Sequence, residues 1–65
     1  MKIKVNGQES ELAEGTDIHG ILTMHRLTPD KVAVELNRRL VRSSQYDTKL
    51  KVGDEIEIVT FVGGG

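Results

Sequence analysis

The sequence predicts an α+β domain in which one short helix covers one face of a β-sheet. Three observations support this: two tight-turn signals that each join a pair of strand-like segments, one stretch with helical spacing between them, and a strongly alternating segment near the end. The chain has 65 residues and no cysteine, so it is one domain that neither disulfides nor thiolate-bound metals stabilise. Its stability must therefore come from one compact apolar core.

The first expected element is a β-hairpin. Residues 2–5 alternate between polar and apolar side chains, which is the pattern of a strand with one buried face. Asn-Gly at 6–7 is the strongest short hairpin signal, because both positions of a type I′ turn need a positive φ. The return segment, residues 8–12, places Glu9 and Glu11 on one face. Exposed charges of this kind favour an edge strand, because they discourage pairing with a second chain.

One helix is expected over about residues 17–26, with Thr16 or Asp17 as its N-cap. Pro29 follows and prevents the helix from continuing. Four residues recur at the spacing of a single helical face, namely Ile18, Ile21, Leu22 and His25.

A second hairpin and a final strand follow the helix. Residues 32–36 alternate, Asn-Arg at 37–38 forms a tight turn, and residues 40–41 return. Residues 43–50 show no period and predict an irregular or 3₁₀ connection. The last strand, residues 55–61, has the cleanest alternation in the chain.

These elements define an expected core and an uncovered sheet face. The single helix covers one face only, so the opposite face has no layer over it. The inward-facing residues are expected to be Ile3, Val5, Leu12, Ile18, Ile21, Leu22, Val32, Val34, Leu36, Leu40, Leu50, Ile56 and Ile58.

The usual catalytic and metal-binding patterns are not found in the sequence. The two histidines, His19 and His25, are six residues apart and do not form the i, i+4 metal pair. A chain this short has little material for the walls of a deep pocket, and it has no glycine-rich phosphate loop. We therefore expect no catalytic residues, no metal and no bound cofactor, and a chain that is not an enzyme by itself.

Charge and hydropathy restrict the partners. Nine basic and ten acidic residues give a net charge of −1, so we expect no nucleic-acid binding. The basic cluster Arg38, Arg39 and Arg42 is interpreted as a solvated turn, with docking to an acidic protein surface as the alternative. No apolar run is long enough to span a membrane and no signal peptide is recognisable, so a cytoplasmic protein that is monomeric when free is expected.

The end of the chain is the strongest functional candidate. On the uncovered face of the last strand, charged residues give way to apolar ones, and we predict that Val59, Phe61 and Val62 dock a partner. Three residues without a Cβ follow, at 63–65. We expect a domain at residues 1–62 and a flexible glycine tail that is narrow enough to enter another protein's active site. The alternative is a frayed end or cloning remnant.

These features together resemble a known family. The hairpin–helix–hairpin–strand plan, the turn Val52-Gly53-Asp54-Glu55 and the ending Ile58-Val59-Thr60-Phe61-Val62-Gly63-Gly64-Gly65 are similar to the β-grasp (ubiquitin-like) sulfur carriers, and above all to the ThiS family of thiamine biosynthesis. The resemblance covers the whole chain. It implies a mixed sheet of about five strands in which the first and last are central and parallel. Many relatives have glycine where Arg38 stands here.

The resemblance also implies a function. In ThiS-like proteins an E1-like partner enzyme uses ATP to adenylate the terminal glycine, and a sulfur donor system, through a cysteine-derived persulfide, converts the adenylate to a thiocarboxylate. Thiazole synthase then receives the sulfur. By this similarity Gly65 is the adenylated and sulfur-carrying residue, and Gly63 and Gly64 are its tether.

Two alternatives remain from sequence alone. The same carrier chemistry serves molybdopterin synthesis and tRNA thiolation, although molybdopterin-synthase small subunits are typically longer. A non-catalytic ubiquitin-like binding module or modifier, with an inert terminus or one that is conjugated to lysine, is the other alternative.

Overall fold

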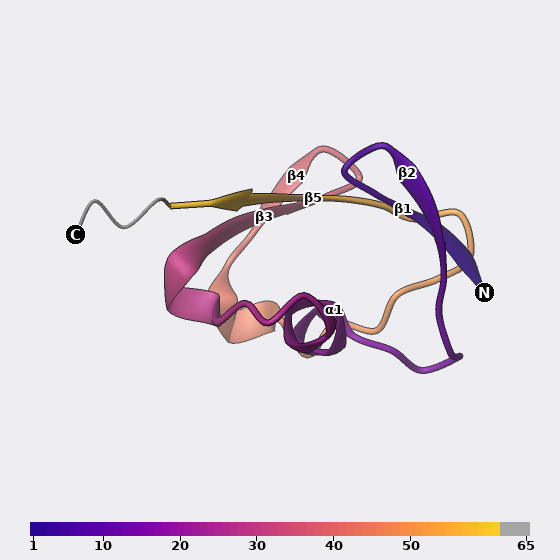
Figure 1. The fold of residues 1–65 in the computed structure, drawn as a ribbon, viewed down its shortest axis with the longest axis horizontal. Coiled ribbons are helices and arrows are strands. Elements are labelled where there is room, and N and C mark those ends of the chain that lie inside the picture. Colours follow the sequence, from indigo (N-terminus) through magenta and orange to yellow (C-terminus); the bar gives the residue numbers. More distant parts are fainter. Residues whose placement is uncertain (62–65) are drawn as a thin grey trace.

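The computed structural model describes residues 1–61, which form one mixed sheet with a single α-helix on one face (Figure 1). The predicted glycine tail at residues 63–65 and Val62 lie outside the described residues. The strands are β1 (Lys2–Val5), β2 (Gln8–Glu11), β3 (Val32–Leu36), β4 (Arg39–Val41) and β5 (Glu55–Thr60), and the helices are α1 (Ile18–Met24) and the 3₁₀ turns η1 (Pro29–Lys31) and η2 (Ser43–Gln45).

The strand order places the last strand in the middle of the sheet. The order is β2-β1-β5-β3-β4, with β1 parallel to β5 and each of the other neighbours antiparallel. In Figure 1, α1 lies beneath the sheet and the opposite face is open. The predicted α+β architecture, with a five-stranded mixed sheet and parallel first and last strands, is confirmed.

Both predicted hairpin turns have the left-handed backbone that a type I′ turn requires. In the first, φ is 51° at Asn6 and 81° at Gly7; in the second, it is 51° at Asn37 and 70° at Arg38. Each turn has two residues, so Val5 pairs with Gln8 and Leu36 pairs with Arg39. Asn37 also holds the second turn against the start of β5, because its Oδ1 accepts the Glu55 N–H at 2.9 Å.

We expect Arg38→Gly to stabilise the domain. Arginine at φ 70° has a Cβ that costs about 1 kcal/mol in the left-handed region, and glycine removes this cost. The melting temperature should rise by about 4–8 °C per kcal/mol for a domain of this size. The converse change, Gly7→Ala, should lower it, although no atom lies within 4 Å of the added methyl, because the strain comes from φ alone. If both variants melt like the parent, turn strain does not limit the stability.

Helix α1 is shorter than the sequence predicted, and both of its ends have a clear cause. Asp17 is the N-cap, and its Oδ1 accepts the Gly20 N–H at 2.8 Å. The helix ends at Met24 and not near residue 26, because Arg26 adopts φ 59°. The Leu27 N–H then donates to the Leu22 carbonyl at 2.8 Å, which is the Schellman arrangement with arginine in the position usually held by glycine.

The core lies between α1 and the sheet, and it confirms most of the predicted set. Leu40 is the clear exception, because its side chain is 71 % exposed. Val5 and Leu36 are half-buried at the edge of the core, and Tyr46, which is not in the expected set, is 2 % exposed. The buried residues are Ile3, Leu12, Ile18, Ile21, Leu22, Val32, Val34, Tyr46, Leu50, Ile56 and Ile58.

The connection between β4 and β5 is fixed to the start of α1. The Tyr46 carbonyl accepts the His19 N–H at 3.0 Å, and the Leu50 N–H donates to the Thr16 carbonyl at 2.9 Å. The rings of His19 and Tyr46 meet edge to face, with centroids 5.8 Å apart. These contacts explain how a segment with no sequence period is held in one place, and they use His19 as a packing residue.

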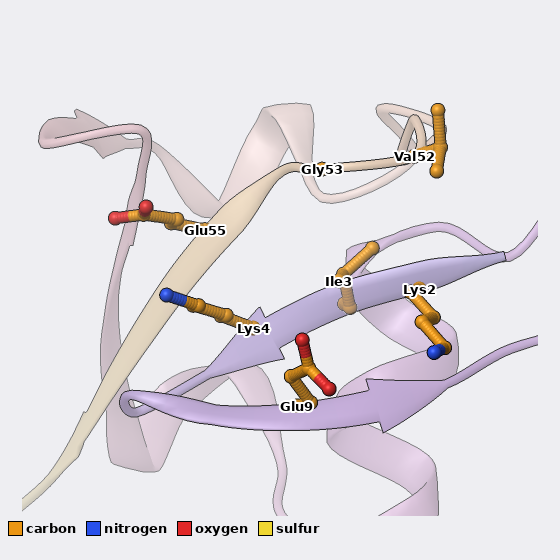
Figure 2. Close-up of a pocket in the computed structure, with 7 residues that line it drawn as sticks. All are labelled: Lys2, Ile3, Lys4, Glu9, Val52, Gly53 and Glu55. Atoms are coloured by element: carbon orange, nitrogen blue, oxygen red, sulfur yellow. The ribbon is translucent and has the colours of Figure 1, made fainter.

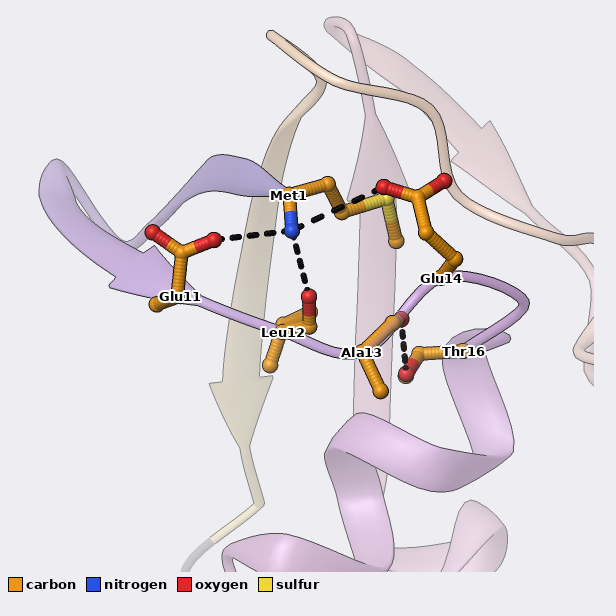
Figure 3. A network of polar contacts seen from close by, with 6 residues as sticks. All are labelled: Met1, Glu11, Leu12, Ala13, Glu14 and Thr16. Carbon is orange, nitrogen blue, oxygen red and sulfur yellow. Dashed lines mark hydrogen bonds and ion pairs between the residues drawn. The ribbon is translucent and has the colours of Figure 1, made fainter.

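The amine of Met1 is clamped by the segment that follows β2. It lies 2.8 Å from Glu11 Oε2 and 3.7 Å from Glu14 Oε2, and it donates to the Leu12 carbonyl at 2.6 Å (Figure 3). The hydrogen bond with Glu11 raises the pKa of the amine above its usual 8.0, and the amine lowers the pKa of Glu11 below its usual 4.5.

This clamp predicts a stability contribution that is limited to a pH window. Its Glu11 part is complete above pH 4.5 and is lost as the pH falls through the lowered pKa of Glu11. Its amine part is complete below pH 8.0 and is lost as the pH rises through the raised pKa of Met1. Urea unfolding of Glu11→Gln should therefore differ most from the parent between these values and converge with it in acid and in alkali. A difference that is constant with pH would contradict this.

Candidate functional site

The end of β5 is held on both sides by backbone and side-chain hydrogen bonds. On one side β1 ends at Val5, and the Oδ1 of Asn6 continues the ladder by accepting the Ile58 N–H at 2.8 Å. On the other side β3 and η1 extend the pairing as far as Phe61, whose N–H donates to the Lys31 carbonyl at 2.8 Å. The sheet therefore positions the chain up to the last described residue.

The side chains of β5 alternate as predicted. Ile56 and Ile58 are buried against α1, whereas Val59 is 61 % exposed on the open face and Phe61 is 56 % exposed beyond the strand. Thr60 is exposed, and it lines a small hollow with His25 and Leu27. The docking role of Val59 and Phe61 stays a prediction, and Val62 lies outside the described residues.

The structure adds Leu40 to this surface, which the sequence reasoning had placed in the core. Leu40 pairs with Glu35, and Glu35 pairs with Glu57, so these three residues form one row across the open face. The two-residue turn at 37–38 already carried the signal, because it pairs residue 36 with 39 and so turns residue 40 away from the core.

We use the term apolar patch for four residues at this end of the open face. Val59 pairs with Ala33 in the row next to that of Leu40, and Phe61 lies one row further. Leu40, Val59 and Phe61 are three of the five large hydrophobic side chains that are exposed among residues 1–61. An exposed apolar cluster of this kind is typical of a surface that contacts a partner, and that role stays a prediction for these residues. The apolar patch consists of Ala33, Leu40, Val59 and Phe61.

The other end of the open face is charged. A shallow hollow of about 200 Å³ lies between β1, β2 and the turn before β5 (Figure 2). In the sheet register Lys4 pairs with Glu9 on one side and with Glu55 on the other, so opposite charges alternate across this row. The hollow is lined by Lys2, Ile3, Lys4, Glu9, Val52, Gly53 and Glu55.

The remaining sequence candidates occupy separate places. His25 ends α1, and Arg38, Arg39 and Arg42 are exposed in the second turn, in β4 and before η2. Residues 1–61 contain no group of three or more histidine, aspartate or glutamate side chains that could hold a metal ion. Within the same residues, no helix has the length and apolar character needed to cross a bilayer.

Comparison with known proteins identifies the family. The model of the ThiS family matches residues 3–65, nearly the whole chain. The chain belongs to the ThiS family. This confirms the resemblance seen in the sequence.

Solved ThiS structures share the fold over the whole chain. The crystal structure of a thiamine biosynthesis protein, ThiS, from Geobacter metallireducens matches with a TM-score of 0.82 and 33 % identity, and the match covers all of both chains. A solution structure of a thiamine biosynthesis protein from the same organism gives the same TM-score and identity over 88 % of its length. The β-grasp prediction is thereby confirmed.

Two curated relatives of ThiS are much longer proteins. A thiazole synthase from Magnetococcus marinus is 41 % identical over the whole of this chain, and one from Paramagnetospirillum magneticum is 36 % identical. This chain spans only 20 % of the length of each. A ThiS-like segment is therefore part of the same polypeptide in these thiazole synthases.

Proposed function

We propose that this chain carries sulfur on the carboxyl group of Gly65 and delivers it to thiazole formation in thiamine biosynthesis. The observation that carries the proposal is the ThiS family match, which extends through the glycine end to residue 65. The fold adds support, because β5 is the central strand and leads directly toward that end, beside the apolar patch.

The chemistry needs activation by a partner. A carboxylate with a pKa of about 3.5 is ionised at neutral pH and is a poor electrophile. We propose that an E1-like enzyme binds ATP and joins the Gly65 carboxylate to AMP with release of pyrophosphate. The outer sulfur of a cysteine persulfide then displaces AMP and forms an acyl disulfide, and a second thiol of the donor system cleaves its S–S bond, which leaves the thiocarboxylate on Gly65 and a disulfide on the donor. The chain itself binds no ATP in this scheme. Gly63 and Gly64 contribute a narrow tether, since they have no side chain to obstruct the partner's active site.

Thiazole synthase is the proposed acceptor of the sulfur. The support is the presence of a segment similar to this whole chain within two thiazole synthases. Two domains that share one polypeptide in some organisms have compatible surfaces, and as separate proteins they would meet through the same contacts. We propose that the free carrier is a monomer that meets the activating enzyme and thiazole synthase in turn.

Intact-mass analysis tests the carrier chemistry directly. The chain is incubated with the activating enzyme, ATP and a sulfur source, and we expect a species whose mass corresponds to the exchange of one oxygen for sulfur. Omitting ATP is the control and should abolish that species. Conjugates to lysine in place of the thiocarboxylate would contradict the proposal and favour a ubiquitin-like modifier. Transfer to thiazole synthase, compared with transfer to a molybdopterin synthase, then identifies the pathway.

Phe61→Asp should weaken partner binding without unfolding the domain. The Phe61 side chain is 56 % exposed, so its replacement should change the free energy of unfolding by no more than about 0.5 kcal/mol. Loss of an aromatic anchor costs about 2 kcal/mol of binding free energy, or roughly thirtyfold in affinity for thiazole synthase. Val52→Asp is the matched control, because Val52 is 75 % exposed at the other end of the open face. Unfolding of Phe61→Asp, seen by circular dichroism, would contradict the assignment of Phe61 to the surface.

A further inference from the structure

Two glutamates face each other beside the apolar patch. Glu35 and Glu57 are direct partners in the β3–β5 register, and both are exposed on the open face. Side chains at such positions have Cβ atoms about 5 Å apart, and like charges there oppose each other. The next member of the row is Leu40, which brings no compensating charge.

The neighbouring row of the same face is arranged differently. There Lys4 lies between Glu9 and Glu55, so a cation separates two anions (Figure 2). The ion pairs within residues 1–61 both involve the Met1 amine, so neither row contains an ion pair between its own side chains. The rows differ in register: a lysine stands between the two glutamates of one, whereas Glu35 and Glu57 face each other with no cation between them.

We infer that the row of Glu35 and Glu57 accepts an arginine or lysine side chain of a protein partner whose neighbouring apolar residues cover the apolar patch. A cation placed between the two carboxylates relieves their repulsion and makes charge-assisted hydrogen bonds to both. The apolar side chains of Leu40 and Val59 lie in the same and in the adjacent row, so they exclude water around that contact. The partner surface has a cation flanked by apolar groups.

Thiazole synthase is the partner that this surface fits, and this assignment rests on the proposed function. In two thiazole synthases a segment similar to this chain is part of the same polypeptide, which keeps the two kinds of domain at a high local concentration. The apolar patch and the glutamate pair occupy successive rows of the open face, which lead along β5 to Phe61, the last described residue.

Two double variants with equal charge test the inference. The first, Glu35→Gln with Glu57→Gln, removes the two carboxylates that face each other. The second, Glu9→Gln with Glu55→Gln, removes the two carboxylates that flank Lys4. Each double variant changes the formal net charge from −1 to +1. Calorimetry with the thiazole synthase of the same organism should show roughly tenfold weaker binding for the first variant and parent-like binding for the second. Raising NaCl from about 50 to about 500 mM should weaken the binding of the parent to thiazole synthase and hardly change the binding of the first variant.

Two further readouts separate a surface effect from a folding or carrier effect. The Glu35→Gln, Glu57→Gln variant should melt no lower than the parent, because a like-charge contact has been removed. Its yield of thiocarboxylate with the activating enzyme should match that of the parent. Equal weakening by both double variants, or a loss confined to the activating enzyme, would overturn the inference. If binding to thiazole synthase depends on Glu35 and Glu57 but no thiocarboxylate forms on the parent protein, the proposed function is overturned and the inference stands.

Discussion

Appending one alanine after Gly65 should abolish thiocarboxylate formation while leaving the domain folded. The added residue moves the reactive carboxyl group by one residue, or about 3.5 Å along an extended chain, and replaces a glycine carboxylate by one that bears a methyl group. Displacements of about 1 Å at a reacting centre can cost about a hundredfold in rate, so we expect at least that loss. Mass analysis after incubation with the activating enzyme, ATP and a sulfur source measures it.

The control has the same number of residues and keeps the terminal chemistry. One glycine inserted within residues 63–65 also lengthens the chain by one residue, but the chain still ends in Gly-Gly. We expect this variant to retain part of the thiocarboxylate yield, because it keeps a terminal glycine and glycine permits a wide range of backbone conformations. Undiminished sulfur transfer by the alanine-extended protein would disprove the role of Gly65.

Ile56→Ala should remove a large part of the free energy of unfolding and lower the melting temperature. Ile56 is 1 % exposed and lies in the central strand between Val5 of β1 and Leu36 of β3. Truncating a buried isoleucine costs about 2–5 kcal/mol, through lost transfer energy and the cavity that remains. A domain of this size has a total stability of roughly 3–10 kcal/mol, so the loss removes a large part of it.

A second position on the same strand provides the comparison. Val59→Ala removes methyl groups from β5 at a side chain that is 61 % exposed, so we expect its free energy of unfolding to change by no more than about 0.5 kcal/mol. Urea unfolding followed by circular dichroism measures both variants. A cost below about 1 kcal/mol for Ile56→Ala would show that the core can repack around the cavity.

Much of the fold could be predicted because local rules and packing agree in this chain. The turns at 6–7 and 37–38 specify both hairpins, and alternation along β5 separates buried Ile56 and Ile58 from exposed Val59. Prediction was less accurate where a residue adopts an unusual backbone conformation. Arg26 ends α1 with a positive φ that its residue type does not suggest, so the helix stops before the predicted residue.

The candidate site was only partly predictable, for a different physical reason. The glycine end is a local feature of the sequence, whereas the surface beside it is assembled across strands. Leu40 has the composition of a core residue, and only the pairing of Leu36 with Arg39 turns it outward. Glu35 and Glu57 are more than 20 positions apart in the sequence, and their opposition depends on the β3–β5 register. Neither relation follows from reading each segment separately.

The central position of β5 determines how the sheet responds to a force applied at the C-terminal end of the chain. A partner that draws the end of the chain into its active site pulls along the axis of β5. The hydrogen bonds that join β5 to β1 and β3 lie across that axis, so they are loaded together in shear and are not broken one after another. The hydrogen bonds nearest to the pulled end are those that the Phe61 N–H donates to the Lys31 carbonyl and the Ile58 N–H donates to Asn6 Oδ1. A pull along β5 is therefore resisted by hydrogen bonds on both of its sides at once, and the sheet stays intact under a force that would separate a strand at the sheet edge more easily.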